Sequence, residues 1–290
     1  MKSKRKEAAQ LLRSELEINQ LLENEKIYEG DYIAPSKEIL YDALVAVAMG
    51  KNLLLKGGTG SGKTKLVEYI AKLLNKSLQS INCSVDLDSE ALLGFKTLTH
   101  EEDKAHIQFI DGPVIQSMKN GNFLYIDELN VAKPDVLSIV NGVLDYRRSI
   151  TNPFTAEVIT AKEGFSVIAA MNVGYVGTTP LNEALKNRFV VVEVPYVQGD
   201  QLKRLLENQS QLKDEKLLQS FVQLSADFIR MVKTGQVSEE VASIRGLLDA
   251  CDLSCYMPPL RAVTRAIVDK LDDQREKDVV KNIAETVFGV

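Results

Sequence analysis

A glycine-rich segment constrains the fold of this 290-residue chain more than any other part of it. The segment reads Gly57-Gly58-Thr59-Gly60-Ser61-Gly62-Lys63-Thr64. It follows an apolar run, Asn52-Leu53-Leu54-Leu55, and it opens a helix-like stretch over residues 63–74. Because glycines have no Cβ atom, successive backbone N–H groups can turn toward one centre. The pattern therefore predicts a buried strand, a tight loop and a helix in direct succession.

The spacing of this loop predicts a phosphate site. Converging N–H groups and the positive end of the following helix dipole both favour an anion. We expect Lys63 to reach the β- and γ-phosphates of a nucleotide, and the hydroxyl of Thr64 to bind Mg²⁺. The alternative is a chance glycine turn in a parallel sheet, and the flanking strand and helix argue against it. The chain is thus expected to bind a nucleoside triphosphate.

Composition excludes several other classes of protein. Hydrophobic residues make up 45% of the chain, which is ample for a core. No apolar run reaches the length of about 18 residues that a transmembrane helix needs, and the basic residues 2–6 are not followed by the apolar segment of a signal peptide. The net charge of −5 argues against a protein that coats nucleic acid. We expect a cytoplasmic protein that does not insert into a membrane, and the acidic charge disfavours nucleic acid as a partner.

Helix-like and strand-like segments alternate between residues 52 and 194. Four apolar runs have the length of buried strands, at residues 52–55, 123–126, 166–171 and 190–194, and residues 78–82 are expected to form a further short strand. This alternation predicts an α/β fold with a parallel sheet sandwiched by helices. After Pro195 only helical patterns remain, at residues 199–208, 213–233, 241–252, 259–271 and 275–287. We therefore expect an α/β domain over residues 31–197 and an all-helical domain over residues 198–290.

Three further segments complete the organisation. Residues 1–30 carry six basic and six acidic residues together with loosely spaced leucines, which indicate a charged helical extension or, equally well, a frayed tail. Residues 95–111 are polar with a short strand-like run at 107–110, as expected of an insertion. Residues 147–160 alternate around an Asn-Pro turn and predict a hairpin. The three cysteines are interpreted as buried apolar residues rather than metal ligands: Cys83 ends a strand, and Cys251 and Cys255 lie one helical turn apart.

The apolar run at residues 123–126 is followed by two carboxylates, Asp127 and Glu128. A strand that ends there delivers both side chains to the carboxyl edge of the sheet, where ligands of open α/β folds bind. Asp127 is expected to hold Mg²⁺, mostly through water, and Glu128 to orient an attacking water as a general base. Two adjacent carboxylates favour hydrolysis over phosphoryl transfer to a small molecule.

Two more polar residues stand next to strands. Asn172 ends the run 166–171, where it can contact the same water or the γ-phosphate, although an Asn that merely starts the turn at Gly174 is the alternative. Residues 181–189 are expected to form a short helix that carries Arg188 into the last strand. In a ring of subunits, such an arginine can reach the neighbour's γ-phosphate and stabilise developing negative charge. A surface ion pair is the alternative for Arg188.

These motifs together resemble the AAA+ ATPases and, more narrowly, the MoxR group with its NorQ/CbbQ branch and the dynein-related module. The resemblance covers about residues 32–271 and rests on the glycine loop, on Asp127-Glu128-Leu129-Asn130, on Met171-Asn172-Val173-Gly174-Tyr175 and on Arg188. Residues 86–94 and 109–114 resemble the two ends of that group's insertion in helix 2. The hairpin at 147–160 falls where the group has its pre-sensor insertion.

The resemblance implies a five-stranded AAA+ sheet followed by a helical lid, with ATP and Mg²⁺ bound between them. It places Arg245 in the sensor 2 segment, where the residue would touch the phosphates from the lid. The expected catalytic residues are Lys63, Glu128, Asn172, Arg188 and Arg245. The expected nucleotide contacts are Gly57, Gly58, Thr59, Gly60, Ser61, Gly62, Lys63, Thr64, Lys65 and Ile33. The expected Mg²⁺ ligands are Thr64 and Asp127.

One departure from the family pattern concerns a second arginine. Many relatives have an arginine directly after the Asp-Glu-x-Asn segment, whereas this chain has Val131, and Lys133 is an uncertain substitute. The main hypothesis is a homo-oligomeric, hexameric ATPase ring that remodels or activates a protein client, such as a partner with a von Willebrand factor A domain. One alternative is a nucleotide-gated switch or scaffold with little turnover. Another is the motor subunit of a DNA-directed complex.

Overall fold

The computed structural model of the protein describes residues 32–84, 86–101, 104–172 and 181–289, so the expected extension at residues 1–30 lies outside the described residues. Within them, five strands form one sheet in the order β2-β5-β8-β1-β9, and every neighbouring pair is parallel. The strands are β1 (Leu53–Gly57), β2 (Leu78–Asn82), β5 (Phe123–Asp127), β8 (Ser166–Asn172) and β9 (Val190–Glu193). The expected α/β fold class is confirmed.

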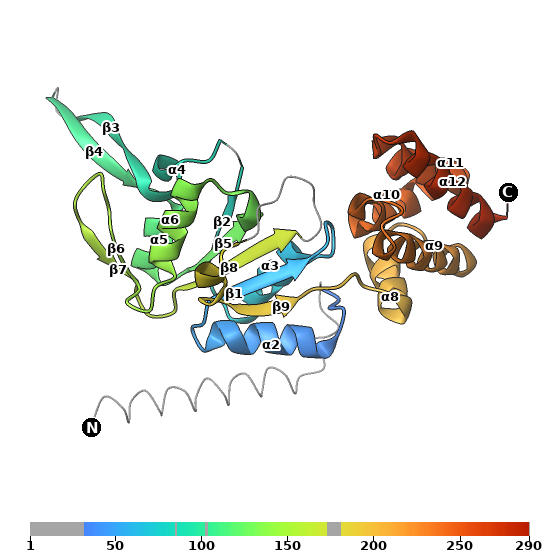
Figure 1. Ribbon diagram of the computed structural model, residues 1–290, viewed down its shortest axis with the longest axis horizontal. Coiled ribbons are helices and arrows are strands. Elements are labelled where there is room, and N and C mark those ends of the chain that lie inside the picture. The colour runs from blue at the N-terminus through green and yellow to red at the C-terminus, as the bar shows by residue number, and fades with distance from the viewer. Residues whose placement is uncertain (1–31, 85, 102–103, 173–180, 290) are drawn as a thin grey trace.

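Helices cover both faces of this sheet (Figure 1). Successive side chains of a strand point to opposite faces, so each apolar strand feeds two cores. Leu53 and Leu55 pack with the helices α2 (Lys37–Ala48) and α3 (Lys63–Leu73), whereas Leu54 packs on the other face with α4 (Ser89–Leu93), α5 (Pro113–Asn120) and α6 (Pro134–Val143). Two buried faces explain the continuous apolar runs 53–55, 123–126 and 167–171 of β1, β5 and β8, whereas the edge strand β2 is largely polar.

The two insertions are β-hairpins. Strands β6 (Ser149–Thr151) and β7 (Val158–Thr160) pair antiparallel, which confirms the hairpin expected at residues 147–160. The insertion at 95–111 differs from the expected single short strand, because β3 (Gly94–Glu101) and β4 (Lys104–Asp111) form a long two-stranded hairpin. Its paired residues Leu98 and Ile107 are 66% and 73% exposed. Because these paired side chains are exposed, burial does not require an apolar run in either strand, and only residues 107–110 read as strand-like in the sequence.

The described part of the chain after Pro195 is helical and has a core of its own, with Phe221, Phe228 and Val263 fully buried. The helices are α8 (Gly199–Gln209), α9 (Glu215–Lys233), α10 (Ile244–Ser254), α11 (Pro259–Ala266) and α12 (Gln274–Phe288), with short 3-10 turns η3 (Glu239–Ala242) and η4 (Val268–Lys270). The helix expected at 259–271 is interrupted at Ile267, whose backbone leaves the helical region with φ −127°. None of the described helices is both long enough and apolar enough to cross a membrane.

Candidate nucleotide-binding and hydrolytic site

The glycine loop connects the carboxyl end of β1 to the first residue of α3. Gly60 and Gly62 have φ angles of 73° and 92°, in the left-handed region that glycine adopts without a steric cost. Gly57 and Gly58 are required for another reason, since a Cβ atom on either would clash with the carbonyl oxygen of Val194 or the hydroxyl of Tyr196. The segment after β9, with Val194 and Tyr196, thus packs directly against the glycine loop and restricts its conformation.

Lys63 is the first residue of α3, and its amine lies inside the loop. Only 6% of the residue is exposed. The amine donates to the carbonyl oxygens of Gly57 and Gly58 at 3.0 and 2.8 Å, and to the amide oxygen of Asn172 at 2.8 Å. Burial lowers the pKa of Lys63, and the negative charges of Asp127, Glu239 and Glu128 oppose that shift. A buried amine held by neutral oxygens is well placed to exchange them for phosphate oxygens.

Next to Lys63, an oxygen atom from helix α3 lies close to an oxygen atom from strand β5. The hydroxyl of Thr64 on α3 donates to Asp127 Oδ2 at the end of β5, at 3.2 Å. It also lies 3.2 Å from the hydroxyl of Tyr125. Burial is the main cause of the raised pKa of Tyr125, so this phenol stays protonated and can share a hydrogen with Thr64. Tyr125 was hidden from sequence reasoning because it reads as one more residue of an apolar strand.

The chemistry of Thr64 and Asp127 suits Mg²⁺, which binds proteins through one or two oxygens and takes further oxygens from phosphate and water. The described residues contain no group of three or more His, Cys, Asp or Glu that could hold a metal by itself. A hydroxyl and a carboxylate at the edge of a phosphate loop therefore fit Mg²⁺ that is held jointly with a nucleotide.

Glu128 directly follows β5 and has a backbone conformation that side chains rarely adopt. Its φ is 54°, in the left-handed region, where it precedes η2 (Leu129–Val131). Its N–H donates to Asp127 Oδ1 at 2.9 Å, and its Oε1 accepts from the amide nitrogen of Asn172 at 3.5 Å. Such strain is characteristic of functional positions that the surrounding structure holds in place. Glu128 is thereby turned toward Asn172 at the end of the neighbouring strand.

Asn172 contacts both sides of the site with one amide group. Its oxygen faces Lys63 and its nitrogen faces Glu128, and these two bonds fix which way the amide is turned. The buried side chain of Asn130 donates to the backbone oxygen of Asn172 at 3.0 Å and so anchors the end of β8. The structure thus brings Lys63, Thr64, Asp127, Glu128 and Asn172 together. Asn130, which the sequence showed only as part of a motif, holds Asn172 in position.

Arg188 lies at the edge of the sheet where the strands begin, opposite the edge where they end and where Lys63 and Asn172 lie. Register pairs Leu53 of β1 with Val190 of β9, so Arg188 is level with the start of β1, whereas the loop follows the end of β1. At about 3.3 Å per residue this separation is about 20 Å, farther than an arginine side chain reaches. Arg188 therefore serves no group at Lys63 of its own chain.

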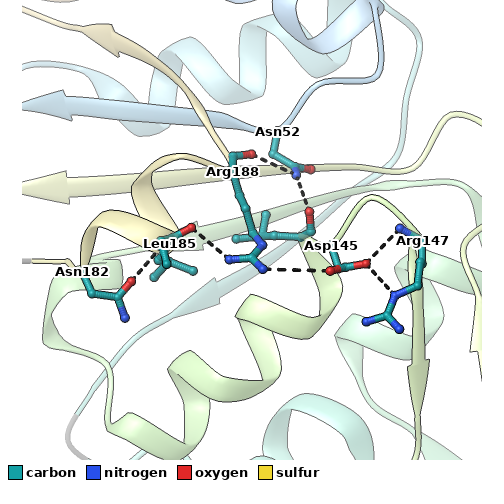
Figure 2. A network of polar contacts seen from close by, with 8 residues as sticks. Asn52, Asp145, Arg147, Asn182, Leu185 and Arg188 are labelled. Atoms are coloured by element: carbon teal, nitrogen blue, oxygen red, sulfur yellow. Dashed lines mark hydrogen bonds and ion pairs between the residues drawn. The ribbon is translucent and has the colours of Figure 1, made fainter.

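A polar network holds Arg188 where it is (Figure 2). Its guanidinium donates to the carbonyl oxygen of Ala184 at 2.9 Å and lies 3.9 Å from Asp145 Oδ2. Asp145 also accepts from the backbone and side chain of Arg147, and these bonds are the main cause of the lowered pKa of Asp145. The buried amide of Asn52 donates to the backbone oxygens of Leu144 and Arg188, each at 3.4 Å. The ion pair considered as an alternative is thus present within the single chain.

The remaining expected residues surround the loop less closely. Arg245 is exposed in the first turn of α10, whose first N–H, on Ile244, lies 3.4 Å from the carbonyl oxygen of Gly60. Lys65 is exposed and pairs with Glu68 at 2.7 Å. Ile33 packs against the core of the helical region. Lys133 is exposed at the start of α6.

Comparison with known proteins agrees with this geometry. Residues 52–189 match the family model of the AAA domain, dynein-related subfamily. A solved structure from Cytophaga hutchinsonii, a proposed ATPase, has the same fold with a TM-score of 0.54 at 16% identity, covering 100% of this chain and 98% of that one. The fold and the site therefore define an AAA-type nucleotide-binding protein.

Closer relatives extend the match to the helical region. YojN of Bacillus subtilis is 62% identical over 257 residues, which are 89% of this chain and 84% of YojN. A protein of Staphylococcus saprophyticus is 54% identical over 259 residues, which are 89% of this chain and 98% of that protein. The chain thus carries an AAA domain of the dynein-related subfamily and belongs to the same family as YojN.

Proposed function

We propose that the protein hydrolyses ATP. The observation that carries this proposal is the position of Asn172, whose amide lies between the amine of Lys63 and the carboxylate of Glu128. Lys63 and the loop amides would bind the β- and γ-phosphates, and Thr64 and Asp127 would hold Mg²⁺, which when bound neutralises phosphate charge. Glu128 would accept a proton from the attacking water, and Asn172 would keep that carboxylate aimed at the phosphate.

Substitution of Glu128 tests this proposal. Glu128→Gln keeps the size of the side chain and removes the base, so kcat should fall by about 100-fold or more while ATP still binds. Glu215→Gln, at an exposed position of α9, is the matched control and should keep the activity of the unchanged protein. If Glu128→Gln and the unchanged protein hydrolyse ATP equally slowly, the protein is a nucleotide-gated switch instead.

We further propose a MoxR-like role, in which a hexameric ring of this chain remodels or activates a protein client. Support comes from Arg188, which lies too far from Lys63 of its own chain to serve it. To act on a neighbouring subunit, Arg188 would exchange its contacts with Ala184 and Asp145 for that subunit's nucleotide. A client with a von Willebrand factor A domain is the expected partner. The site would then be complete only between subunits, and the ATPase rate per subunit should rise steeply with protein concentration.

The client can be captured with the same variant. Glu128→Gln with ATP should stall the ring on its client, whereas Lys63→Ala with ATP should not form that state and serves as the control. A protein with a von Willebrand factor A domain that is enriched with Glu128→Gln alone supports the proposed role. Enrichment of DNA, together with ATPase activity that DNA stimulates, would favour a DNA-directed motor instead.

A further inference from the structure

The short turn η3 of the helical region lies directly against the glycine loop. The carboxylate of Glu239, at the start of η3, accepts a hydrogen bond from the backbone N–H of Thr59 at 3.2 Å. The first residues after η3 continue the contact, because the N–H of Ile244 lies 3.4 Å from the carbonyl oxygen of Gly60. A Cβ atom on Gly60 would clash with Ser243, so the two backbones approach as closely as glycine allows.

A third element holds Glu239 in this place. The hydroxyl of Tyr196, in the segment after β9, donates to the backbone oxygen of Glu239 at 3.3 Å. The same hydroxyl stands against Gly58, where a Cβ atom would clash with it. Tyr196 therefore touches the loop and η3 together. The position of the Glu239 carboxylate is set by three separate parts of the chain.

The contact between Glu239 and Thr59 is chemically an anion bound to a phosphate loop. Backbone N–H groups of such loops bind phosphate oxygens, and a carboxylate oxygen has the same charge and the same accepting geometry. The charge of Glu239 also reaches Lys63, because it is among the groups that oppose the lowering of the lysine pKa. A phosphate that enters the loop would meet both the occupied N–H and the repulsion of a like charge.

We propose that Glu239 competes with the nucleotide for the glycine loop and thereby sets its affinity. Phosphate displaces the carboxylate from Thr59, and η3 leaves the loop together with the first turn of α10, which carries Arg245. Nucleotide binding and movement of the helical region away from the loop are then coupled, so that each favours the other. This inference rests on the proposed binding of nucleoside triphosphate at the loop.

Affinity measurements test the competition. When a ligand binds only the state in which the contact is open, its apparent affinity falls by the fraction of molecules in that state. With about one molecule in ten open, removal of the contact should lower the Kd for nucleotide by about tenfold. The probes are N-methylanthraniloyl-ADP and N-methylanthraniloyl-ATP with Mg²⁺, titrated by fluorescence into the full chain.

Four variants define the outcome. Glu239→Gln removes the charge, and Glu239→Asp shortens the side chain by one methylene so that it no longer reaches Thr59; both should lower the Kd. Glu240→Gln removes the same charge from the adjacent exposed residue and should leave the Kd within about twofold. Lys63→Ala should abolish binding. Circular dichroism shows whether each variant is folded.

The possible results separate the inference from the proposed function. The competition is overturned if both Glu239 variants bind nucleotide as the unchanged protein does or more weakly. It is also overturned if Glu240→Gln lowers the Kd as much as the Glu239 variants do. Equal binding by the unchanged protein and Lys63→Ala contradicts nucleotide binding at the loop and, with it, the competition. Hydrogen–deuterium exchange gives a second measurement, because nucleotide should raise exchange at residues 239–244 in the unchanged protein, and no change there contradicts the coupled movement.

Discussion

The amine of Lys63 donates a hydrogen bond to the amide oxygen of Asn172 across 2.8 Å. The two residues lie at the ends of different elements, one at the start of α3 and the other at the end of β8. β1 and β8 pair in register from Leu53 to Gly57, so the glycine loop and Asn172 leave the sheet at the same level. The contact therefore follows from the order of the strands, and it joins the lysine of the glycine loop to the residue that faces Glu128.

Loss of the Asn172 amide should affect turnover more than nucleotide binding. Asn172→Ala removes the contact to Glu128, whereas Lys63 keeps its bonds to two loop carbonyls. We expect kcat to fall by about 100-fold, as on removal of one positioned polar group in other active sites, with a much smaller change in KM. Steady-state ATPase assays measure both constants. Asn282→Ala, an exposed amide in α12, is the control, and a loss confined to KM would contradict the role of Asn172.

Thr64 should determine the requirement for Mg²⁺. Thr64→Val keeps the shape of the side chain but removes the hydroxyl that faces Asp127, so the Mg²⁺ concentration for half-maximal ATPase activity should rise roughly tenfold. Thr64→Ser retains the hydroxyl and should behave like the unchanged protein. Titration of Mg²⁺ after removal of metal with EDTA measures the effect. The same Mg²⁺ dependence in both variants would show that Thr64 is not a ligand.

The part of this site that lies next to strands could be predicted from sequence. Asp127, Glu128 and Asn172 each follow an apolar run, and parallel strands bring their carboxyl ends to one edge of the sheet. The loop was equally clear, because its glycines and its flanking elements occur together. Local sequence patterns therefore predict those site residues whose position is set by the end of a strand.

Contacts between distant segments were beyond sequence reasoning. Glu239 lies 180 residues from Thr59, and nothing in an acidic surface pattern shows that it meets the glycine loop. Asn52 reads as the polar start of a strand, yet it ties Arg188 to the end of α6. Only part of β4 was predicted in the β3–β4 hairpin, because its paired residues Leu98 and Ile107 are exposed and burial does not require an apolar run in either strand.

The reactivity of the cysteines tests the packing of both regions. Burial raises the pKa of Cys83 and of Cys251 to about 12, whereas Cys255 is exposed next to the end of α10, so the expected burial of Cys255 is wrong. Thiolates are the reactive form, so Cys83 and Cys251 should remain inert toward Ellman's reagent at pH 8. One thiol should react quickly in the native protein and all three in denaturant. Rapid reaction of three thiols without denaturant would contradict the two buried positions.

Mixing two inactive variants tests whether Arg188 acts on a neighbouring subunit. Lys63→Ala cannot bind phosphate and Arg188→Ala lacks the arginine, so each alone should be inactive. In a mixed ring, a site is complete where a subunit with Lys63 adjoins a subunit with Arg188, which for equal amounts and random head-to-tail assembly is about a quarter of the sites. We expect the mixture to recover about a quarter of the ATPase activity, after dissociation and reassembly of the two variants together. Mixing Arg188→Ala with the double variant Lys63→Ala/Arg188→Ala is the control and should recover nothing. An Arg188→Ala protein that is fully active by itself would show that Arg188 serves only the ion pair with Asp145.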